Sequence, residues 1–125
     1  MAGYSGTPLP KKLGVKPGSR VLVLDAPDGF LPEVDRVDGG PADVIVSFHT
    51  ERAELERRLP ALRALMRPAA GLWIAWPKRA SGVATDLTED VVRELALANR
   101  LVDNKVCAID ATWSGLRLVI RRADR

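Results

Sequence analysis

Short apolar runs separated by turn residues dominate the pattern of the chain. Nearly unbroken apolar runs occupy residues 20–25, 43–48 and 71–76, each bounded by glycine, proline or polar residues. Runs of this length without alternation are typical of strands that are buried on both faces of a sheet. Two further runs, residues 105–110 and 116–121, are joined by five residues that end in Gly115. This connection predicts an antiparallel hairpin after the three buried strands.

Helical periodicity appears in two segments between these runs. Residues 51–67 place apolar side chains at i, i+4, i+7 and i+11, which predicts one helix with a buried stripe. Pro60 lies inside that helix, so we expect a kink or two abutting segments. Residues 68–71 should then stop the helix. The four members of the stripe are Leu55, Leu59, Leu62 and Met66.

A second helix is predicted over residues 88–100. Asp86 or Thr88 would cap it, and two acids in its first turn suit the positive end of the helix dipole. Its predicted buried stripe is Val91, Leu95, Ala98 and Val102.

The order strand, helix, strand, helix and hairpin indicates an α/β fold. Right-handed crossovers favour a small Rossmann-like, mostly parallel sheet of about five strands, with helices on its faces and one antiparallel strand near its edge. Residues 1–125 fit a single domain, in which residues 1–19 form a segment rich in glycine and proline. Residues 26–42 have room only for a helical turn and a brief strand.

The composition excludes several kinds of site but does not identify a function. One cysteine, Cys107, excludes an internal disulfide and a multi-cysteine metal site, and one histidine, His49, leaves little material for zinc chemistry. We therefore predict no metal, no cofactor and no catalytic residue. No apolar run is long enough to span a bilayer and no signal-peptide pattern is visible, which predicts a cytoplasmic protein.

Charge is arranged in blocks. The net charge is +3; residues 1–20 carry four cations and no acid, whereas residues 25–43 carry six acids and one cation. The C-terminal end is basic again. Mixed blocks and an aromatic content of 5% disfavour nucleic acid as a partner, although weak binding through the basic termini remains a third hypothesis.

Ligands of such sheets bind beyond the carboxyl ends of the strands, which directs attention to three loops. The first loop, residues 25–30, has one glycine, one proline and two acids, and is either a remnant cofactor loop or an ordinary acidic turn. His49 follows the second strand without a recognisable nucleophile or charge partner, which indicates a hydrogen-bonded cap or a surface residue. Cys107 fits structural burial, and Trp73 and Trp76 should point to opposite faces of the sheet.

The third loop is the most suggestive. Lys78, Arg79, Ser81 and Gly82 follow a strand end and precede a helix, so charge and backbone donors together could hold an anion. The alternative is a solvated loop. We predict a ligand or partner site at Lys78, Arg79 and Ser81, with Lys105, Trp113 and residues 7–12 contributing.

Three core pieces, residues 16–25, 42–47 and 62–74, resemble those of class I S-adenosylmethionine-dependent methyltransferases. The final hairpin resembles theirs as well. More specifically, the whole chain resembles the bacterial domain-of-unknown-function-3052 family, which has no established activity. This second resemblance rests on Tyr4-Ser-Gly-Thr-Pro-Leu9, Lys12-Leu-Gly14, Trp76-Pro-Lys78, Ser81-Gly82, Thr85-Asp-Leu87, Asp103-Asn-Lys105 and Trp113-Ser-Gly115.

The methyltransferase resemblance implies a glycine-rich cofactor loop and an acid at the end of the next strand. Here the loop reads Ala26-Pro-Asp-Gly29, and the 17 residues between Asp25 and Asp43 cannot hold two β-α units. We therefore expect a truncated methyltransferase-like domain that is a non-catalytic binding or regulatory module, recognising a protein partner or a small anionic ligand. The alternative is a minimal or relic S-adenosylmethionine-dependent methyltransferase.

Overall fold

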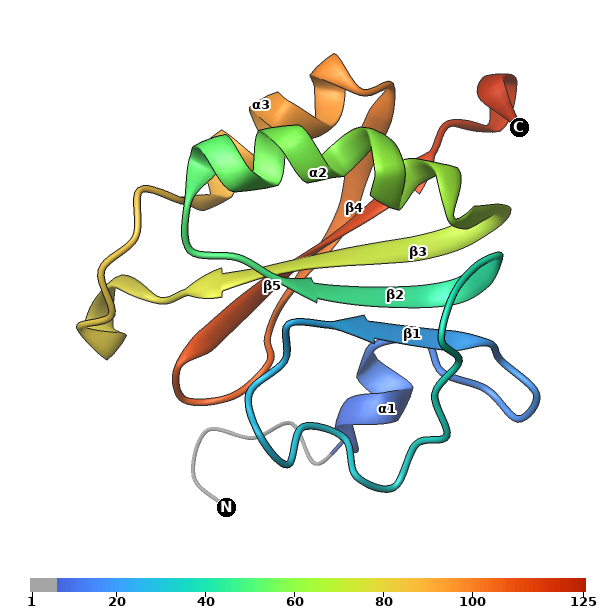
Figure 1. Ribbon diagram of the computed structural model, residues 1–125, viewed down its shortest axis with the longest axis horizontal. Coiled ribbons are helices and arrows are strands. Elements are labelled where there is room, and N and C mark those ends of the chain that lie inside the picture. Colours follow the sequence, from blue (N-terminus) through green and yellow to red (C-terminus); the bar gives the residue numbers. More distant parts are fainter. Residues whose placement is uncertain (1–6) are drawn as a thin grey trace.

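A single mixed sheet of five strands organises the protein. The computed structural model describes residues 7–125, and Figure 1 shows the strands in the order β1-β2-β3-β5-β4. The first three are parallel, and β5 runs antiparallel between β3 and β4, which confirms the predicted α/β fold. The strands are β1 (Val21–Leu24), β2 (Ala42–Phe48), β3 (Met66–Pro77), β4 (Leu101–Ala108) and β5 (Trp113–Ile120).

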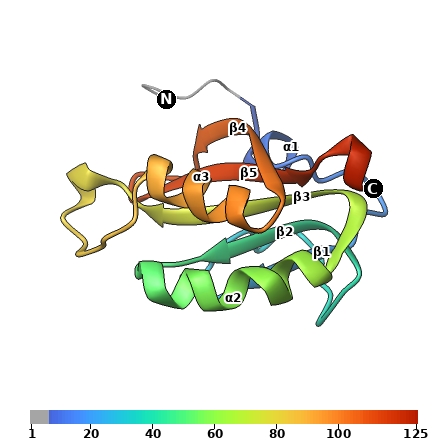
Figure 2. The same cartoon turned by 90° about the horizontal axis from the view of Figure 1, so that it is seen from above.

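Helices cover the two faces of the sheet unequally. Both longer helices, α2 (Arg52–Ala64) and α3 (Glu89–Ala98), pack on one face, and α1 (Leu9–Lys12) lies on the other (Figures 1 and 2). Two short 3-10 turns occupy Arg79–Ser81 and Arg122–Asp124. Among residues 7–125, none of the helices has the length and apolar character that crossing a membrane requires.

Two apolar clusters, one on each face, form the core. Trp76 belongs to the cluster under α2 and α3, and Trp73 to the cluster under α1, as the sequence predicts for residues three apart on a strand. Trp73 also donates its indole N–H to the Leu13 carbonyl at 3.0 Å. Three members of the predicted stripe of α2, Leu55, Leu59 and Leu62, are buried on that helix, whereas the fourth, Met66, is buried in β3.

The boundary between α2 and β3 differs from the prediction. The helix continues past Pro60 and ends at Ala64, and β3 begins at Met66, so residues 68–71 belong to a strand and not to a helix stop. Met66 pairs with Ala42, but Gly71 pairs with Val44, so residues 67–70 form a bulge. The missing N–H of Pro68 is tolerated there because a bulged residue makes no ladder bond.

The α3–β4 boundary was also predicted too late. β4 begins at Leu101, directly after Arg100, whose positive φ of 61° turns the chain. Because β4 starts early, the hairpin loop moves to residues 109–112. The buried residues of α3 are Val92, Leu95 and Ala96. The prediction named Val91 and Ala98 with Leu95, but Val91 is only half-buried and Ala98 is exposed.

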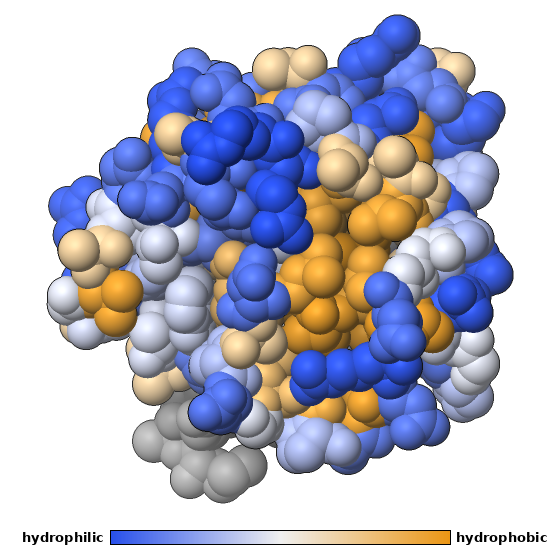
Figure 3. All heavy atoms as spheres, viewed as in Figure 1, coloured by the Kyte–Doolittle hydropathy of each residue, from blue (hydrophilic) through white to orange (hydrophobic). Residues whose placement is uncertain are grey.

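The segment between β1 and β2 contains no helix or strand within residues 25–41. Its only backbone bond to β1 is that of the Val37 N–H to the Val21 carbonyl, at 2.8 Å, so β1 is an edge strand. Between α2 and this segment, apolar side chains remain visible at the surface (Figure 3). Sheet area that a helix would cover in a larger α/β domain is therefore partly open here.

Candidate functional site

The carboxyl ends of β1, β2 and β3 and the β4–β5 hairpin lie at the same end of the sheet. We call this end the rim. Pro77 pairs with Trp113, and the Lys78 N–H donates to the Thr112 carbonyl at 2.7 Å. The hairpin therefore lies at the same rim as the predicted site loop. Two cavities open there, in the region where α/β sheets bind ligands.

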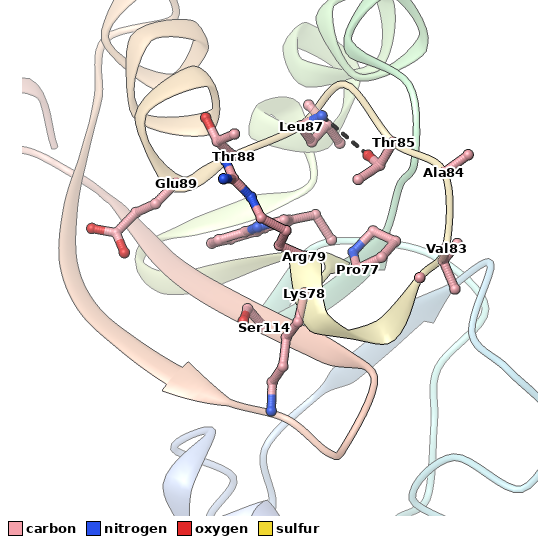
Figure 4. Close-up of a pocket in the computed structure, with 12 residues that line it drawn as sticks. Pro77, Lys78, Arg79, Val83, Ala84, Thr85, Leu87, Thr88, Glu89 and Ser114 are labelled. Carbon is pink, nitrogen blue, oxygen red and sulfur yellow. Dashed lines mark hydrogen bonds between the residues drawn. The ribbon is translucent and has the colours of Figure 1, made fainter.

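The first rim cavity lies between the end of β3 and the start of α3, and we call it the β3–α3 cavity. It measures about 530 Å³, and Lys78, Arg79, Thr85, Thr88 and Ser114 contribute to its lining. Figure 4 shows the Arg79 side chain directed towards Thr88, whereas Lys78 points the other way, past Ser114. Arg79 is thus the cation placed to meet a ligand in this cavity.

Hydroxyl groups fix the loop that bounds the β3–α3 cavity. Ser81 donates its Oγ–H to the Lys78 carbonyl at 2.6 Å and accepts the Val83 N–H at 3.2 Å, so its hydroxyl holds the turn. Gly82, with a φ of 76°, reverses the chain in a conformation that glycine adopts without strain. Thr85 donates to the Thr50 carbonyl at 2.6 Å, and Thr88 caps α3 through the Val91 N–H.

The charge of the β3–α3 cavity is not balanced by its surroundings. Within residues 7–125, neither Lys78 nor Arg79 forms an ion pair. Glu89 also lines the cavity, but its carboxylate lies 2.6 Å from the Arg93 guanidinium, which occupies it. An anion could therefore pair with Arg79 without first displacing a protein carboxylate.

The second rim cavity lies at the ends of β1 and β2, and we call it the β1–β2 cavity. It measures about 480 Å³ and is lined by Asp25, His49, Glu51, Glu54, Arg58 and Trp113, among others. Arg58 lies 3.4 Å from both Asp25 and Glu54, so a single cation is shared between two of the three acids. Trp113 packs edge-on against Phe48 at a centroid distance of 5.0 Å. This cavity is acidic, with an aromatic wall.

His49 is buried, which corrects the surface alternative. Its Nε2 lies 2.7 Å from Ser47 Oγ and its Nδ1 lies 2.5 Å from Glu54 Oε1. Because a carboxylate only accepts, the Nδ1 that faces Glu54 carries a proton; in the tautomer that has its single proton there, Nε2 accepts from the serine hydroxyl. The arrangement has the order of a catalytic triad, but the side chain of His49 is 0% exposed and Ser47 is 0% exposed. No substrate reaches this serine, so the relay fastens α2 to β2.

Sequence reasoning missed this relay. Ser47 lies in β2 and His49 directly follows the last residue of that strand, so the alternation of extended chain puts both side chains on the same face, and Glu54 lies in the first turn of α2. That spacing is a usable signal, since a helix that follows its strand directly folds back over the strand end.

The five predicted site residues occupy three places. Lys78 and Arg79 line the β3–α3 cavity, and Ser81 lies in the same loop but bonds to backbone. Trp113 lines the β1–β2 cavity. Lys105 lies on the α1 face, where it donates to the Lys12 carbonyl at 3.2 Å. Residues 7–125 contain no group of three His, Cys, Asp or Glu side chains that could hold a metal ion. Tyr4, Ser5 and Gly6 lie outside the described residues.

Comparison with known proteins identifies the fold class. The chain is similar to the magnesium protoporphyrin IX methyltransferase of Synechocystis PCC 6803 with bound S-adenosylmethionine, at 16% identity and a TM-score of 0.52, over 66% of this chain and 41% of that one. It is similar to LepI in complex with S-adenosylmethionine at 13% identity and a TM-score of 0.51, over 90% and 39% of the two chains. LaPhzM matches at 16% identity and a TM-score of 0.52, over 90% and 46%.

The fold is thus a methyltransferase-like Rossmann fold, and the chain spans less than half the length of these three structures. No protein-family model matches the chain, and no curated protein sequence matches it. The resemblance to the domain-of-unknown-function-3052 family, like the cytoplasmic location, therefore stays a prediction.

Proposed function

We propose that this methyltransferase-like domain is a non-catalytic binding module whose ligand site is the β3–α3 cavity. The ligand class is a small organic anion, such as a carboxylate or a phosphate monoester. The observation that carries the proposal is Arg79, which points into the cavity and has no ion-pair partner among residues 7–125. A guanidinium donates two parallel hydrogen bonds to such an anion, which gives strength and orientation together.

The size and construction of the cavity support a small molecule over a protein partner. A volume of about 530 Å³ lies within the range of small-molecule sites, which is roughly 300 to 1,000 Å³. Its loop is fixed by the Ser81 and Thr85 hydroxyls and by the bond from Lys78 to Thr112, so little ordering is required on binding. Lys78, at the mouth, would add long-range attraction for the anion.

The second candidate is a minimal S-adenosylmethionine-dependent methyltransferase with its cofactor in the β1–β2 cavity. The position of that cavity favours it, because it adjoins the end of β1, and two of the similar structures contain S-adenosylmethionine. The residues oppose it. Pro27 offers no N–H to the methionine carboxylate, and Asp25, Glu51 and Glu54 would repel that group. Arg58, which could attract it, is shared between Asp25 and Glu54.

The two candidates are separated by a thermal-shift panel of small carboxylates, phosphate esters and S-adenosylmethionine. A ligand that binds only the folded state raises the apparent stability by mass action, about 2.7 kcal/mol at a hundredfold excess over Kd. We expect at least one anion to raise Tm and the cofactor to leave it unchanged.

The double substitution Lys78→Ala/Arg79→Ala should remove that shift while leaving the Tm of the ligand-free protein nearly unchanged, because Arg79 is exposed, Lys78 is only half-buried and neither forms an ion pair within residues 7–125. The matched control is Arg121→Ala/Arg122→Ala, which removes the same charge far from the rim and should keep the shift. Micromolar binding of S-adenosylmethionine would support the second candidate instead. An anion-induced shift of Tm that persists in the Lys78/Arg79 variant would mean that the anion binds at another surface.

A further inference from the structure

A second cationic site lies on the α1 face of the sheet, away from both rim cavities. Lys11 and Lys12 from α1, Lys105 from β4 and Arg117 from β5 line a hollow of about 270 Å³, which we call the basic groove. Lys11 and Arg117 are more than a hundred positions apart in the sequence. The fold brings the basic N-terminal block against the two C-terminal strands.

A β-bulge creates the groove. Asp103 pairs with Leu118 but Lys105 pairs with Arg117, so two steps along β4 correspond to one step along β5. Asp103 therefore turns to the α3 face, where it pairs with Arg93 at 3.2 Å. Lys105 turns to the opposite face, beside Arg117. Regular alternation would have put Asp103 and Lys105 on one face, so the bulge separates the acid from the cations.

Backbone contacts hold the lysines in place. Lys105 Nζ donates to the Lys12 carbonyl at 3.2 Å, and Lys12 Nζ donates to the Ala108 carbonyl at 3.4 Å. Each ammonium has three donors, so both keep N–H groups for a ligand. These crossed contacts tie α1 to β4 and fix the two charges close together.

Arg117 is the least compensated cation of the groove. It is half-buried, its guanidinium forms no hydrogen bond or ion pair with any residue of 7–125, and its side chain lies directly over Gly71. Burial, together with the nearby Arg125, holds the pKa of Arg117 below its usual range. A buried positive charge without a partner gains most from an added anion.

We propose that the basic groove binds a ligand that carries two adjacent phosphate groups. No carboxylate lines it within the described residues, and its four cations match the charge of two phosphates, since one phosphate monoester carries about two negative charges near neutral pH. No aromatic side chain lines it either, so the phosphates and not a base would be recognised. Free pyrophosphate presents two linked phosphates of high charge, whereas a nucleic-acid backbone presents successive phosphodiesters that carry one negative charge each.

The test measures binding of two probes, pyrophosphate by calorimetry and a fluorescent single-stranded oligonucleotide by anisotropy. Lys11→Ala/Lys105→Ala should weaken binding about tenfold or more. The control Arg57→Ala/Arg100→Ala removes the same charge at exposed positions in α2 and between α3 and β4, and should weaken binding less than about twofold. Lys11→Glu alone tests the groove without touching any contact that holds the fold, since the Lys11 side chain is exposed.

Gly71→Ala tests the geometry at constant charge. A Cβ at this position would lie 2.5 Å from Arg117 Nε, so the guanidinium must move, and binding should weaken about fivefold. Pyrophosphate binding with these sensitivities supports a small diphosphate ligand, and oligonucleotide binding alone with the same sensitivities supports a nucleic-acid backbone. Binding of neither probe, or equal losses in the Arg57→Ala/Arg100→Ala control, would overturn the proposal.

Discussion

The two rim cavities are built by neighbouring strands, yet they differ in how their charges are satisfied. In the β1–β2 cavity, Asp25 and Glu54 share Arg58, and Glu54 also accepts from His49. In the β3–α3 cavity, Arg79 has no carboxylate partner among residues 7–125. Protein groups thus neutralise much of the first cavity's charge, whereas the second retains charge for a ligand. We infer from this difference that a position at the strand ends is not sufficient for binding an anion, and that an unpaired cation is also needed.

The largest loss of stability is expected when the hydrogen bonds of His49, beside the β1–β2 cavity, are removed. His49→Ala removes both hydrogen bonds of the relay, leaves the Ser47 hydroxyl buried without its partner and opens a cavity beneath α2. We expect the free energy of unfolding to fall by about 2 to 4 kcal/mol, measured by urea denaturation.

The matched control is Glu51→Ala, which removes an exposed carboxylate from the same cavity and should change stability by less than about 0.5 kcal/mol. A His49 variant as stable as this control would show that the relay does not fasten α2. The hydrogen bonds beside the β1–β2 cavity would then not contribute to the stability of the fold.

A smaller loss of stability is expected from substitution of Asp86, which connects the loop of the β3–α3 cavity to α2. Asp86, in the loop before α3, accepts the N–H of Arg52 at the start of α2 at 2.7 Å. It therefore caps a helix whose own N-cap residue, Glu51, makes no side-chain cap bond. Asp86→Ala should cost about 1 kcal/mol, which chemical denaturation can resolve. Asp86→Asn keeps an acceptor oxygen and should recover most of the loss; equal losses in both variants would contradict a capping role.

The smallest expected effect concerns a paired carboxylate remote from the rim, which serves as a reference. The Arg20 backbone N–H, with the Arg67 guanidinium, holds the pKa of Asp43 below its usual value near 3.8. A lowered folded-state pKa means that the contribution to stability is present above the unfolded pKa and is lost as pH falls through the folded pKa. Asp43→Asn should therefore lower stability at neutral pH by less than about 1 kcal/mol.

The difference between Asp43→Asn and the unsubstituted protein should shrink as pH falls below about 4 and through the lowered folded-state pKa of Asp43, because the protonated carboxyl then leaves both proteins uncharged at this position. Thermal unfolding at a series of pH values measures this. A difference that stays constant across the acid range would mean that the Asp43 charge does not contribute.

The fold was more predictable than the site, and particular residues show why. Continuous apolar runs identified β2 and β3 because burial on both faces requires them, whereas β4, which is largely exposed, was identified with β5 from the short connection that ends in Gly115. The start of β3 was misplaced because Pro68 imitates a helix stop when its bulge is not visible in the sequence. Lys78 and Arg79 were found because their loop directly follows a strand. Lys105 was misassigned to the rim because its direction depends on the bulge in β4, which no local pattern encodes.

The central claim is that anions bind at the β3–α3 cavity and not at the β1–β2 cavity. The most direct measurement is a titration of the 15N-labelled protein with citrate, in which backbone amide shifts locate the bound anion. We predict that saturable shifts gather on residues 78–89, centred on Arg79 and Thr88, and that they vanish in the Lys78→Ala/Arg79→Ala variant. Shifts centred on Asp25, His49 and Glu54 instead, or shifts that persist in the variant, would contradict the claim.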